Sequence, residues 1–373
     1  MKRASILLTG ATGAVGSDLL RRLAARADLT VNVIVRRNGK APVERVRALL
    51  HHAEISASVN VVEGDISAGG NLGVRDDRLR ELQRETTHII HSAGSTAFTL
   101  PLADARRANV DGSGNVLQFA RGCPALECGA FLSTVYVSGK RCGEFAESDF
   151  GDNGLGFVNS YEESKAEMEE TIRAAMAALP LILVRLSTVV GDATTGRVTH
   201  FNTIHHAVRL LYSGLAPMIP GDPDEPVDIV SSDFVAEAVL HLVEHAPRPG
   251  VFHVAAGKES SNSLREIIDE TMDALRAHRP QWRKRSVEKP LIVDLDTYEL
   301  FVKSVEETGN PVLREATRSI RTFAYQLAHP KVFETRQAAA TLAWNGIAPQ
   351  QSLAFYPRVV KYCLDSNWGT RPC

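Results

Sequence analysis

Two side chains that could transfer a proton stand four residues apart, Tyr161 and Lys165. Ser160 and Glu163 have the spacing of a capping box, and the early glutamates suit a helix start, so a helix is expected to begin here. Residues four apart lie on one face of a helix. A neighbouring ammonium favours the phenolate, so we expect a lowered tyrosine pKa and proton transfer near neutral pH. The spacing alone also occurs by chance, so its weight depends on the rest of the chain.

A glycine-rich turn near the N-terminus could bind a pyrophosphate. Gly10, Gly13 and Gly16 separate an apolar run at residues 5–9 from a helical pattern at residues 14–26. Glycine lets phosphates approach backbone N–H groups at the positive end of a helix. The spacing is one residue wider at its first step than the dinucleotide fingerprint Gly-x-Gly-x-x-Gly. The strand before the turn and the helix after it favour nucleotide binding over a glycine-rich turn with no ligand.

The end of the second predicted strand, residues 31–35, predicts which dinucleotide is bound. Arg36 and Arg37 follow this strand. About twenty residues past the glycines, an acidic residue binds the ribose hydroxyls of NAD, whereas an arginine accommodates the 2′-phosphate of NADP. Arg36 occupies this position and favours NADP(H) over NAD(H). The alternative is a solvated strand end without a ligand.

Small and polar residues follow the next two predicted strands. Asp65 is well placed for the adenine amino group, although a turn-forming aspartate explains it equally well. The segment 92–94 is small enough to close against a cofactor, and Asn109 needs a polar partner within the predicted helix 106–121. The predicted cofactor-binding residues are Gly10, Thr12, Gly13, Ala14, Val15, Gly16, Arg36, Asp65, Ile66, Ser92, Ala93, Gly94, Asn109, Tyr161, Lys165, Leu186 and Val189.

Strands and helices alternate through the first half of the chain, which predicts an α/β fold with a doubly wound parallel sheet of the Rossmann type. Predicted strands lie at residues 5–9, 31–35, 59–62, 88–91, 129–132, 181–185 and 251–254. After Gly191 the alternation lapses, and the remainder is mainly helical. We expect an NADP-binding domain of residues 1–191 and 228–257, and a smaller, mainly helical substrate domain of residues 192–227 and 258–373.

Composition excludes several classes of partner. The 373 residues are 44% hydrophobic and 23% charged with a net charge of −2, so neither a nucleic-acid partner nor a membrane span is expected. The apolar run after Met1 is too short for a signal peptide and predicts the first strand instead. The cysteines lack a Cys-x-x-Cys pair, which favours a reducing cytoplasm and no metal site. They are Cys123, Cys128, Cys142, Cys363 and Cys373.

Taken together, the motifs resemble those of the extended short-chain dehydrogenases/reductases over about residues 1–255. They are Thr9-Gly-Ala-Thr-Gly-Ala-Val-Gly16, Gly64-Asp65-Ile66, His91-Ser-Ala-Gly94, Ser133-Thr134, Tyr161-x-x-x-Lys165 and Arg185-x-x-x-Val-Val-Gly191. Segments 132–139, 161–167, 189–196 and 227–236 look most like the thioester reductase and fatty acyl-CoA reductase branch, the male-sterility type. Leu186 stands where the family usually has proline.

The resemblance implies a catalytic set of Thr134, Tyr161 and Lys165. Thr134 would polarise the substrate carbonyl, Tyr161 would protonate it, and Lys165 would tune Tyr161 and hold the nicotinamide ribose. It further implies NADPH-dependent reduction of an acyl thioester, bound to CoA or to an acyl carrier protein, to an aldehyde or alcohol. The alternatives are a ketone or alcohol oxidoreductase, a sugar-nucleotide epimerase, and a non-catalytic dinucleotide sensor. The sequence predicts no oligomeric state.

Two features of the last half leave alternatives open. An apolar stripe on the predicted helix 353–364 is either core or the lid of an acyl channel, and core is the better interpretation. His200, His205 and His206 could line a substrate pocket, but ordinary burial or exposure on an amphipathic helix is favoured.

Overall fold

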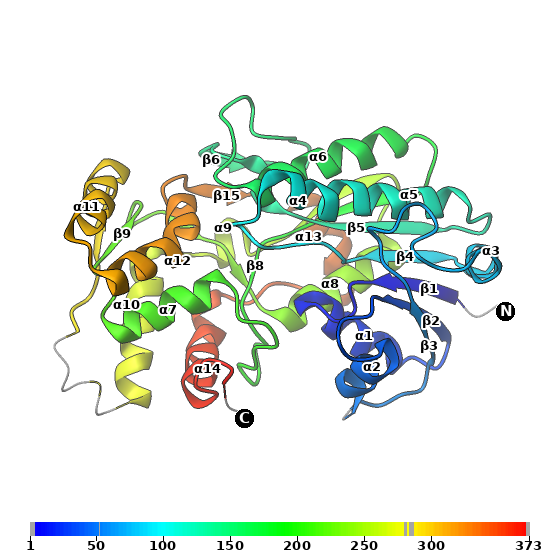
Figure 1. Ribbon diagram of the computed structural model, residues 1–373, viewed down its shortest axis with the longest axis horizontal. Helices are drawn as coiled ribbons and strands as arrows, with labels where there is room; N and C mark the ends of the chain where they lie inside the picture. Colours follow the sequence, from blue (N-terminus) through cyan, green and yellow to red (C-terminus); the bar gives the residue numbers. More distant parts are fainter. Residues whose placement is uncertain (1–3, 52, 280–281, 283–286, 371–373) are drawn as a thin grey trace.

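The central element is a seven-stranded sheet whose strands all run parallel, in the order β12-β7-β5-β4-β1-β2-β3 (Figure 1). The computed structural model describes residues 4–51, 53–279, 282 and 287–370, so Met1 and Cys373 lie outside the described residues. The strands are β1 (Ala4–Thr9), β2 (Leu29–Val35), β3 (Ser58–Glu63), β4 (His88–His91), β5 (Cys128–Thr134), β7 (Leu181–Leu186) and β12 (Gly250–Val254). The order changes direction between β1 and β4, and ligands of such sheets bind at the carboxyl ends of the strands at this point. The predicted fold class is confirmed.

Helices cover both faces of the sheet because successive strand residues point to opposite sides. Leu7 and Leu8 are both fully buried, but Leu8 packs with one core cluster and Leu7 with another. The first cluster includes α1 (Ala14–Ala24), α2 (Pro42–Leu50) and α8 (Ser232–His245). The second includes α3 (Asp76–Glu85), α5 (Gly112–Arg121) and α6 (Ser160–Ala175).

The predicted helix 106–121 is interrupted. It begins earlier as α4 (Leu102–Arg106), passes through a π-helical turn at Arg107–Asp111, and continues as α5. A π turn admits one extra residue and is frequent at functional sites. This turn contains Asn109, which the sequence singled out.

A second core lies beside the sheet domain and is built mainly from α7 (Thr203–Ser213), α10 (Leu264–His278) and α14 (Ser352–Asp365). On α14, Phe355, Val359 and Val360 are at most 1% exposed, and the Tyr356 hydroxyl accepts a hydrogen bond of 3.3 Å from Thr271. The interpretation of this stripe as core is therefore confirmed, and its buried side chains do not form an open acyl channel. Figure 1 shows α11 (Leu295–Thr308) and α12 (Pro311–Leu327) at the outer end of this region.

Several very short strand pairs lie outside the central sheet, and of their strands the sequence indicates only the segment 227–230, which the structure divides between β10 and β11. The pairs are β6 (Gly143–Phe145) with β15 (Lys331–Phe333), β9 (Met218–Pro220) with β14 (Leu291–Val293), β10 (Pro226–Val227) with β13 (Asn262–Ser263), and β8 (Thr188–Val189) with β11 (Ile229–Val230). Two or three residues carry too little periodicity to predict a strand. These pairs join segments that are distant in the sequence.

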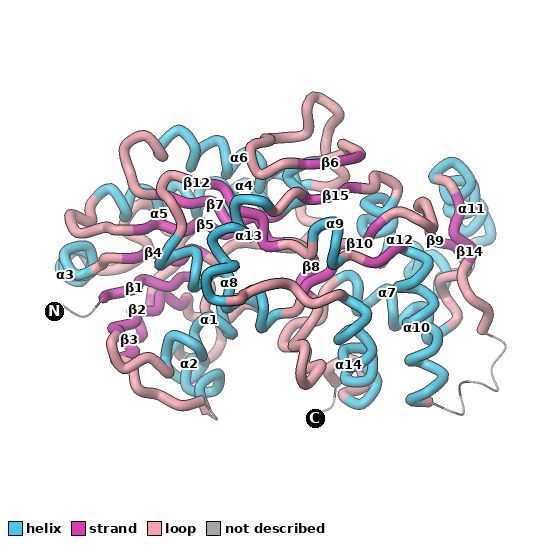
Figure 2. The backbone as a smooth tube through the Cα atoms, turned by 180° about the vertical axis from the view of Figure 1, so that it is seen from behind, coloured by secondary structure: helices cyan, strands magenta, loops and turns pink. Residues whose placement is uncertain are grey.

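The C-terminal segment returns to the sheet domain. Seen from behind in Figure 2, α13 (Arg336–Leu342) lies close to α8 and β12, and its Ala338 and Leu342 are buried in the first core cluster. Short α9 (Gly257–Ser260) follows β12. None of the helices in the described part of the chain is both long and apolar enough to cross a bilayer.

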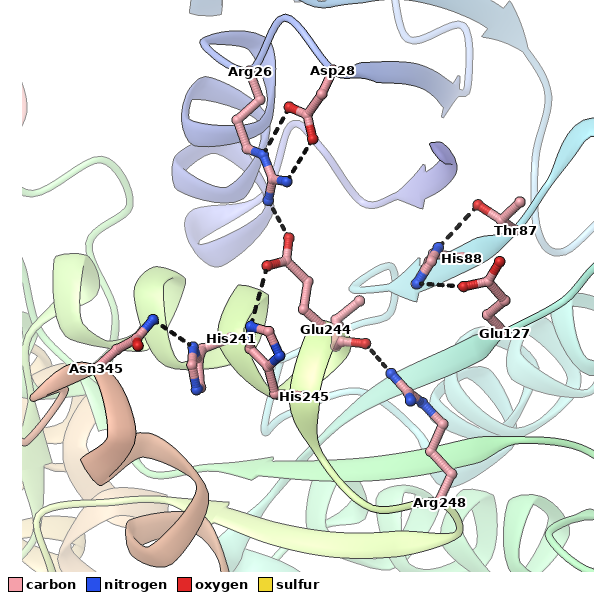
Figure 3. Close-up of polar contacts among 11 residues, drawn as sticks. Arg26, Asp28, Thr87, His88, Glu127, His241, Glu244, His245, Arg248 and Asn345 are labelled. Carbon is pink, nitrogen blue, oxygen red and sulfur yellow. Dashed lines mark hydrogen bonds and ion pairs between the residues drawn. The ribbon is translucent and has the colours of Figure 1, made fainter. Parts of the chain in front are cut away.

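Polar contacts join α8 to its neighbours (Figure 3). Arg26, just after α1, forms ion pairs with Asp28 and with Glu244 of α8. One turn earlier on α8, the amide of Asn345 lies 3.4 Å from Nδ1 of His241. These contacts are largely exposed and worth little individually, so the apolar packing of α8 carries most of its attachment.

Candidate active site

The glycine turn forms a close-fitting cradle at the carboxyl end of β1. Gly10 has a φ of +73°, and a Cβ placed there would lie 2.5 Å from the backbone nitrogen of Ala93. A Cβ on Gly16 would lie 2.1 Å from the carbonyl oxygen of Gly10. Only glycine fits at both positions, and α1 begins directly after Gly13 with its backbone N–H groups free of side-chain caps. A pyrophosphate fits such a helix N-terminus, so these residues suit a dinucleotide.

The loop after β4 closes against this turn, while the contact of residues 92–94 with the cofactor stays a prediction. Ser92 donates its backbone N–H to the carbonyl of Thr9 at 3.3 Å, and Ala93 donates to the Thr9 hydroxyl at 3.4 Å. The carboxyl ends of β1 and β4 are thus held together across the point where the strand order changes direction.

At the predicted adenosine end, Arg36 is exposed and its guanidinium has no hydrogen bond or ion pair with any residue the structure describes. Arg37 is engaged instead, because it pairs with Glu63 through contacts of 2.8 and 2.9 Å. The sequence analysis missed Arg45 of α2. It donates 2.9 Å hydrogen bonds to the Thr12 hydroxyl and to the Arg36 carbonyl, which brings a second guanidinium to this corner.

Asp65 and Ile66 form part of a turn after β3 in the structure. Oδ1 of Asp65 accepts the Ser67 backbone N–H at 2.8 Å, which is the turn-forming alternative that the sequence left open. Asn115 donates to the Ile66 carbonyl at 2.7 Å. The second carboxylate oxygen of Asp65 makes no hydrogen bond to the described residues, so an adenine contact there stays a prediction.

The predicted capping box at the start of α6 is wrong by one residue. Asn159, not Ser160, caps the helix by accepting the Glu162 backbone N–H at 3.0 Å. Oε2 of Glu162 in turn accepts the N–H of Val158 at 2.9 Å. The shift arises because asparagine caps a helix as well as serine does. Tyr161 and Lys165 still lie on one face in the first turns of α6.

Lys165 is buried beneath the end of β5. Its ammonium donates to the Leu132 carbonyl at 2.7 Å and lies 3.3 Å from Sδ of Met168. Burial lowers the pKa of Lys165 to about 8, and the nearby Glu169 carboxylate opposes this shift.

The expectation of a lowered tyrosine pKa is wrong for this arrangement. Burial raises the pKa of Tyr161 to about 12, while a hydrogen bond with the Thr134 side chain acts in the opposite direction. The Lys165 ammonium is committed to Leu132 and Met168, so it does not offset the loss of hydration around the phenol. Tyr161 is therefore protonated near neutral pH, which is the form that can donate a proton to a substrate oxygen.

Asn109 positions the loop that faces Tyr161. Its Oδ1 accepts the Ser95 N–H at 2.8 Å, and its Nδ2 donates to the Ser95 carbonyl and to the Ser164 hydroxyl of α6. Both the oxygen and the nitrogen of the Asn109 amide are thus hydrogen bonded within the protein, and the amide links the loop to α6. Farther along this loop, the Phe98 ring lies 5.5 Å from the ring of Tyr161, a neighbour that the sequence did not indicate.

The segment after β7 is fixed from two sides. Leu186 is buried in the sheet core. The Val189 carbonyl accepts Asn202 Nδ2 at 2.8 Å, and the Val190 carbonyl lies 2.7 Å from Nε2 of His205. His205 is 2% exposed, which confirms the core interpretation for this histidine.

His200 and His206 are exposed, and His200 hydrogen bonds to the backbone of Thr12. None of the three histidines lines the small cavity beside Tyr136. The contact to Thr12 ties the segment before α7 to the glycine turn.

Comparison with known proteins assigns the family. Residues 8–239 match the NAD-binding family model described as "Male sterility protein". A Drosophila melanogaster protein named as a fatty acyl-CoA reductase is 26% identical over 74% of this chain and 59% of its own length. A linear gramicidin synthase polypeptide of Brevibacillus parabrevis is 27% identical over 64% of this chain and 5% of its own length. The chain thus spans less than two thirds of these relatives.

A solved structure shares the whole fold. The terminal R domain from the myxalamid PKS-NRPS biosynthetic pathway superposes with a TM-score of 0.78 at 20% identity, covering 100% of this chain and 93% of that one. A UDP-glucuronic acid 4-epimerase of Bacillus cereus gives a TM-score of 0.66 at 17% identity, covering 98% and 99% of the two chains. The chain belongs to the NAD-binding male sterility protein family.

Proposed function

We propose that this protein is an NADPH-dependent reductase that transfers hydride to the carbonyl carbon of an acyl thioester. The observation that carries the proposal is the convergence of Thr134, Tyr161 and Lys165 at the carboxyl end of β5, on the same edge of the parallel sheet as the glycine cradle after β1. Relatives named as a fatty acyl-CoA reductase and as a linear gramicidin synthase subunit support the thioester as substrate. Reduction of an acyl thioester is an activity that would suit both of these relatives.

The bound dinucleotide supplies the hydride. Thr134 and Tyr161 would hydrogen bond the thioester oxygen and hold its developing negative charge, which is the stabilisation that carbonyl chemistry needs most. The protonated Tyr161 would then donate its proton to that oxygen. Loss of the thiol from the resulting hemithioacetal gives an aldehyde, and a second reduction gives an alcohol. Lys165 would hold the nicotinamide ribose next to Tyr161.

We infer NADP(H) as the cofactor from the two arginines at the adenosine corner. Arg36 carries an unengaged guanidinium, and Arg45 is anchored within reach of it on α2. A guanidinium binds a phosphate with charge-assisted hydrogen bonds. The Glu63 carboxylate at the end of β3 is already paired with Arg37 and so does not favour a ribose diol.

A carrier protein is the proposed source of the acyl group besides CoA, because one similar structure is a thiolation-reductase di-domain, with a TM-score of 0.75.

The activity test measures NADPH oxidation with acyl-CoA, acyl carrier protein, ketone, aldehyde and nucleotide-sugar substrates. We expect turnover on the thioesters. Turnover confined to ketones or to a nucleotide sugar would reject the proposal.

A further inference from the structure

A small cavity of about 40 Å³ lies beside Tyr136, just after the end of β5. Tyr136 forms one wall, and α12 and β15 contribute Gln326, Leu327 and Lys331. Tyr136 follows Thr134 by two residues and donates its backbone N–H to the Thr134 hydroxyl at 3.3 Å. Gln326 of the opposite wall donates to Glu162, the neighbour of Tyr161, at 2.7 Å, so residues next to the predicted catalytic set contact both sides of the cavity.

Lys331 is a buried cation that the catalytic scheme does not use. It is 7% exposed, and its ammonium donates one hydrogen bond of 2.8 Å, to the His329 carbonyl. No ion pair joins it to another residue in the part of the chain that is described. An ammonium has three donors, so the contact with His329 leaves two of them for other acceptors. Burying such a group is costly unless acceptors are supplied.

Glu162 influences Lys331 without pairing with it. The Glu162 carboxylate accepts hydrogen bonds from Val158 N–H at 2.9 Å, Asn159 Nδ2 at 3.1 Å and Gln326 Nε2 at 2.7 Å. These contacts occupy the carboxylate, and the last of them ties the α12 wall of the cavity to the residue next to Tyr161. Lys331 therefore stays available on the cavity side of this link.

We propose that Lys331 is a specificity-determining residue that donates a hydrogen bond to a neutral oxygen of the acyl group, such as an amide carbonyl or a hydroxyl. This inference rests on the proposed thioester reduction. A neutral acceptor fits better than a carboxylate because Asp222 and Glu225 line the same cavity and would repel an anion. A plain alkyl chain would leave the Lys331 ammonium without an acceptor.

The test uses CoA thioesters of matched length on the full chain. N-acetylglycyl-CoA and pentanoyl-CoA have the same number of chain atoms, but only the first has an amide carbonyl. Succinyl-CoA supplies an anionic end instead. We expect kcat/KM for N-acetylglycyl-CoA to exceed that for pentanoyl-CoA by at least about tenfold, as for a hydrogen bond to a charged group.

Lys331→Met keeps an unbranched apolar side chain that is one atom shorter and removes the ammonium. We expect it to lower kcat/KM for N-acetylglycyl-CoA by at least about tenfold, mainly through KM, and to leave pentanoyl-CoA within about twofold. The matched control is Lys361→Met, an exposed lysine of α14 paired with Asp365, which should change neither substrate. Thermal unfolding of Lys331→Met should occur at the wild-type temperature or above it, because the variant removes a buried charge.

Three results would overturn the inference: equal losses on both substrates, a wild-type enzyme that prefers succinyl-CoA, or a Lys331→Met variant that unfolds well below wild type. Failure of the proposed thioester reduction itself gives a different result. The wild-type protein would then consume NADPH with none of the three thioesters, and the inference on Lys331 would also be rejected.

Discussion

Tyr161 has a pKa raised to about 12 by burial, and this sets its role in the proposed reaction. A phenol that stays protonated at neutral pH is suited to donate a proton to a carbonyl oxygen as hydride arrives. The Tyr161→Phe variant keeps the ring and removes the proton, so we expect NADPH to bind as in wild type and turnover to fall at least about a hundredfold.

Fluorescence titration of NADPH and steady-state assays measure the two quantities separately. Tyr325→Phe is the matched control, since that hydroxyl contacts only the exposed Glu299 among the described residues. Near-normal turnover by Tyr161→Phe would remove this residue from the mechanism.

Arg36 and Arg45 carry the prediction on cofactor choice. Replacing Arg36 with Asp removes a charge-assisted contact to the 2′-phosphate and adds repulsion, so affinity for NADPH should fall far more than affinity for NADH. Arg45→Met should also lower affinity for NADPH more than affinity for NADH, because it removes the guanidinium that hydrogen bonds to the Thr12 hydroxyl beside Arg36. Arg47→Gln, on the exposed side of the same helix, is the control and should leave the ratio unchanged.

Dissociation constants of both cofactors, measured on each variant, decide this question. A wild-type protein that binds NADH as tightly as NADPH would contradict the assignment of these arginines.

Helix α6 is fixed to the sheet by a buried ion pair. Glu169 of α6 and Arg185 of β7 are 2% and 0% exposed and meet through contacts of 2.7 to 3.1 Å, with His253 adjoining at 3.2 Å. Removing one partner leaves an uncompensated buried charge, which costs about 3–5 kcal/mol. We therefore expect Glu169→Gln to lower the free energy of unfolding by an amount in that range.

The same helix offers a matched control. Glu167 of α6 pairs with Arg106 at the surface, and loss of such an exposed pair costs less than about 1 kcal/mol. Denaturant unfolding of Glu169→Gln and Glu167→Gln compares the two. Equal costs would show that the buried pair does not hold α6 in place.

Much of the fold was predictable at the level of elements, because parallel strands buried on both faces read as long apolar runs between helical patterns. The seven sheet strands, the glycine turn and the Tyr161–Lys165 spacing are of this local kind. The contacts of Arg45 and Phe98 are not, since each depends on elements far apart in the sequence. Burial reversed the expected Tyr161 pKa shift, because spacing on a helix does not reveal where a neighbouring ammonium is committed.

Across the whole molecule, His205 joins the two regions of the chain and makes their attachment sensitive to acid. Nδ1 of His205 lies 3.0 Å from the Asn202 N–H and Nε2 lies 2.7 Å from the Val190 carbonyl, so the neutral ring is satisfied on both sides. Burial lowers its pKa to about 4, below the ordinary value of 6.5 that the unfolded chain has. Below pH 6.5 the unfolded state therefore binds a proton that the folded state does not, and stability is lost as the pH falls toward 4.

The His205→Gln variant tests this linkage. Its free energy of unfolding should fall less steeply than that of wild type between pH 6.5 and 4, by up to about 1.4 kcal/mol per pH unit. The comparison with wild type is needed because Glu162 has a raised pKa and shifts stability in the opposite direction. His245→Gln, at an exposed site on α8, should reproduce the wild-type slope. Identical slopes for His205→Gln and wild type would contradict the linkage.

The proposed reaction of this molecule brings a nicotinamide hydride to a thioester carbonyl that Tyr161 protonates. The most direct measurement follows deuterium from NADPH labelled at the transferable position into the product of an acyl-CoA, by mass spectrometry. We predict an aldehyde that carries one deuterium on the former acyl carbon, or an alcohol that carries two, and neither product from Tyr161→Phe above about a hundredth of the wild-type rate. The contradicting result is an acyl-CoA that stays unreduced, while a ketone or a nucleotide sugar assayed in parallel takes up the deuterium.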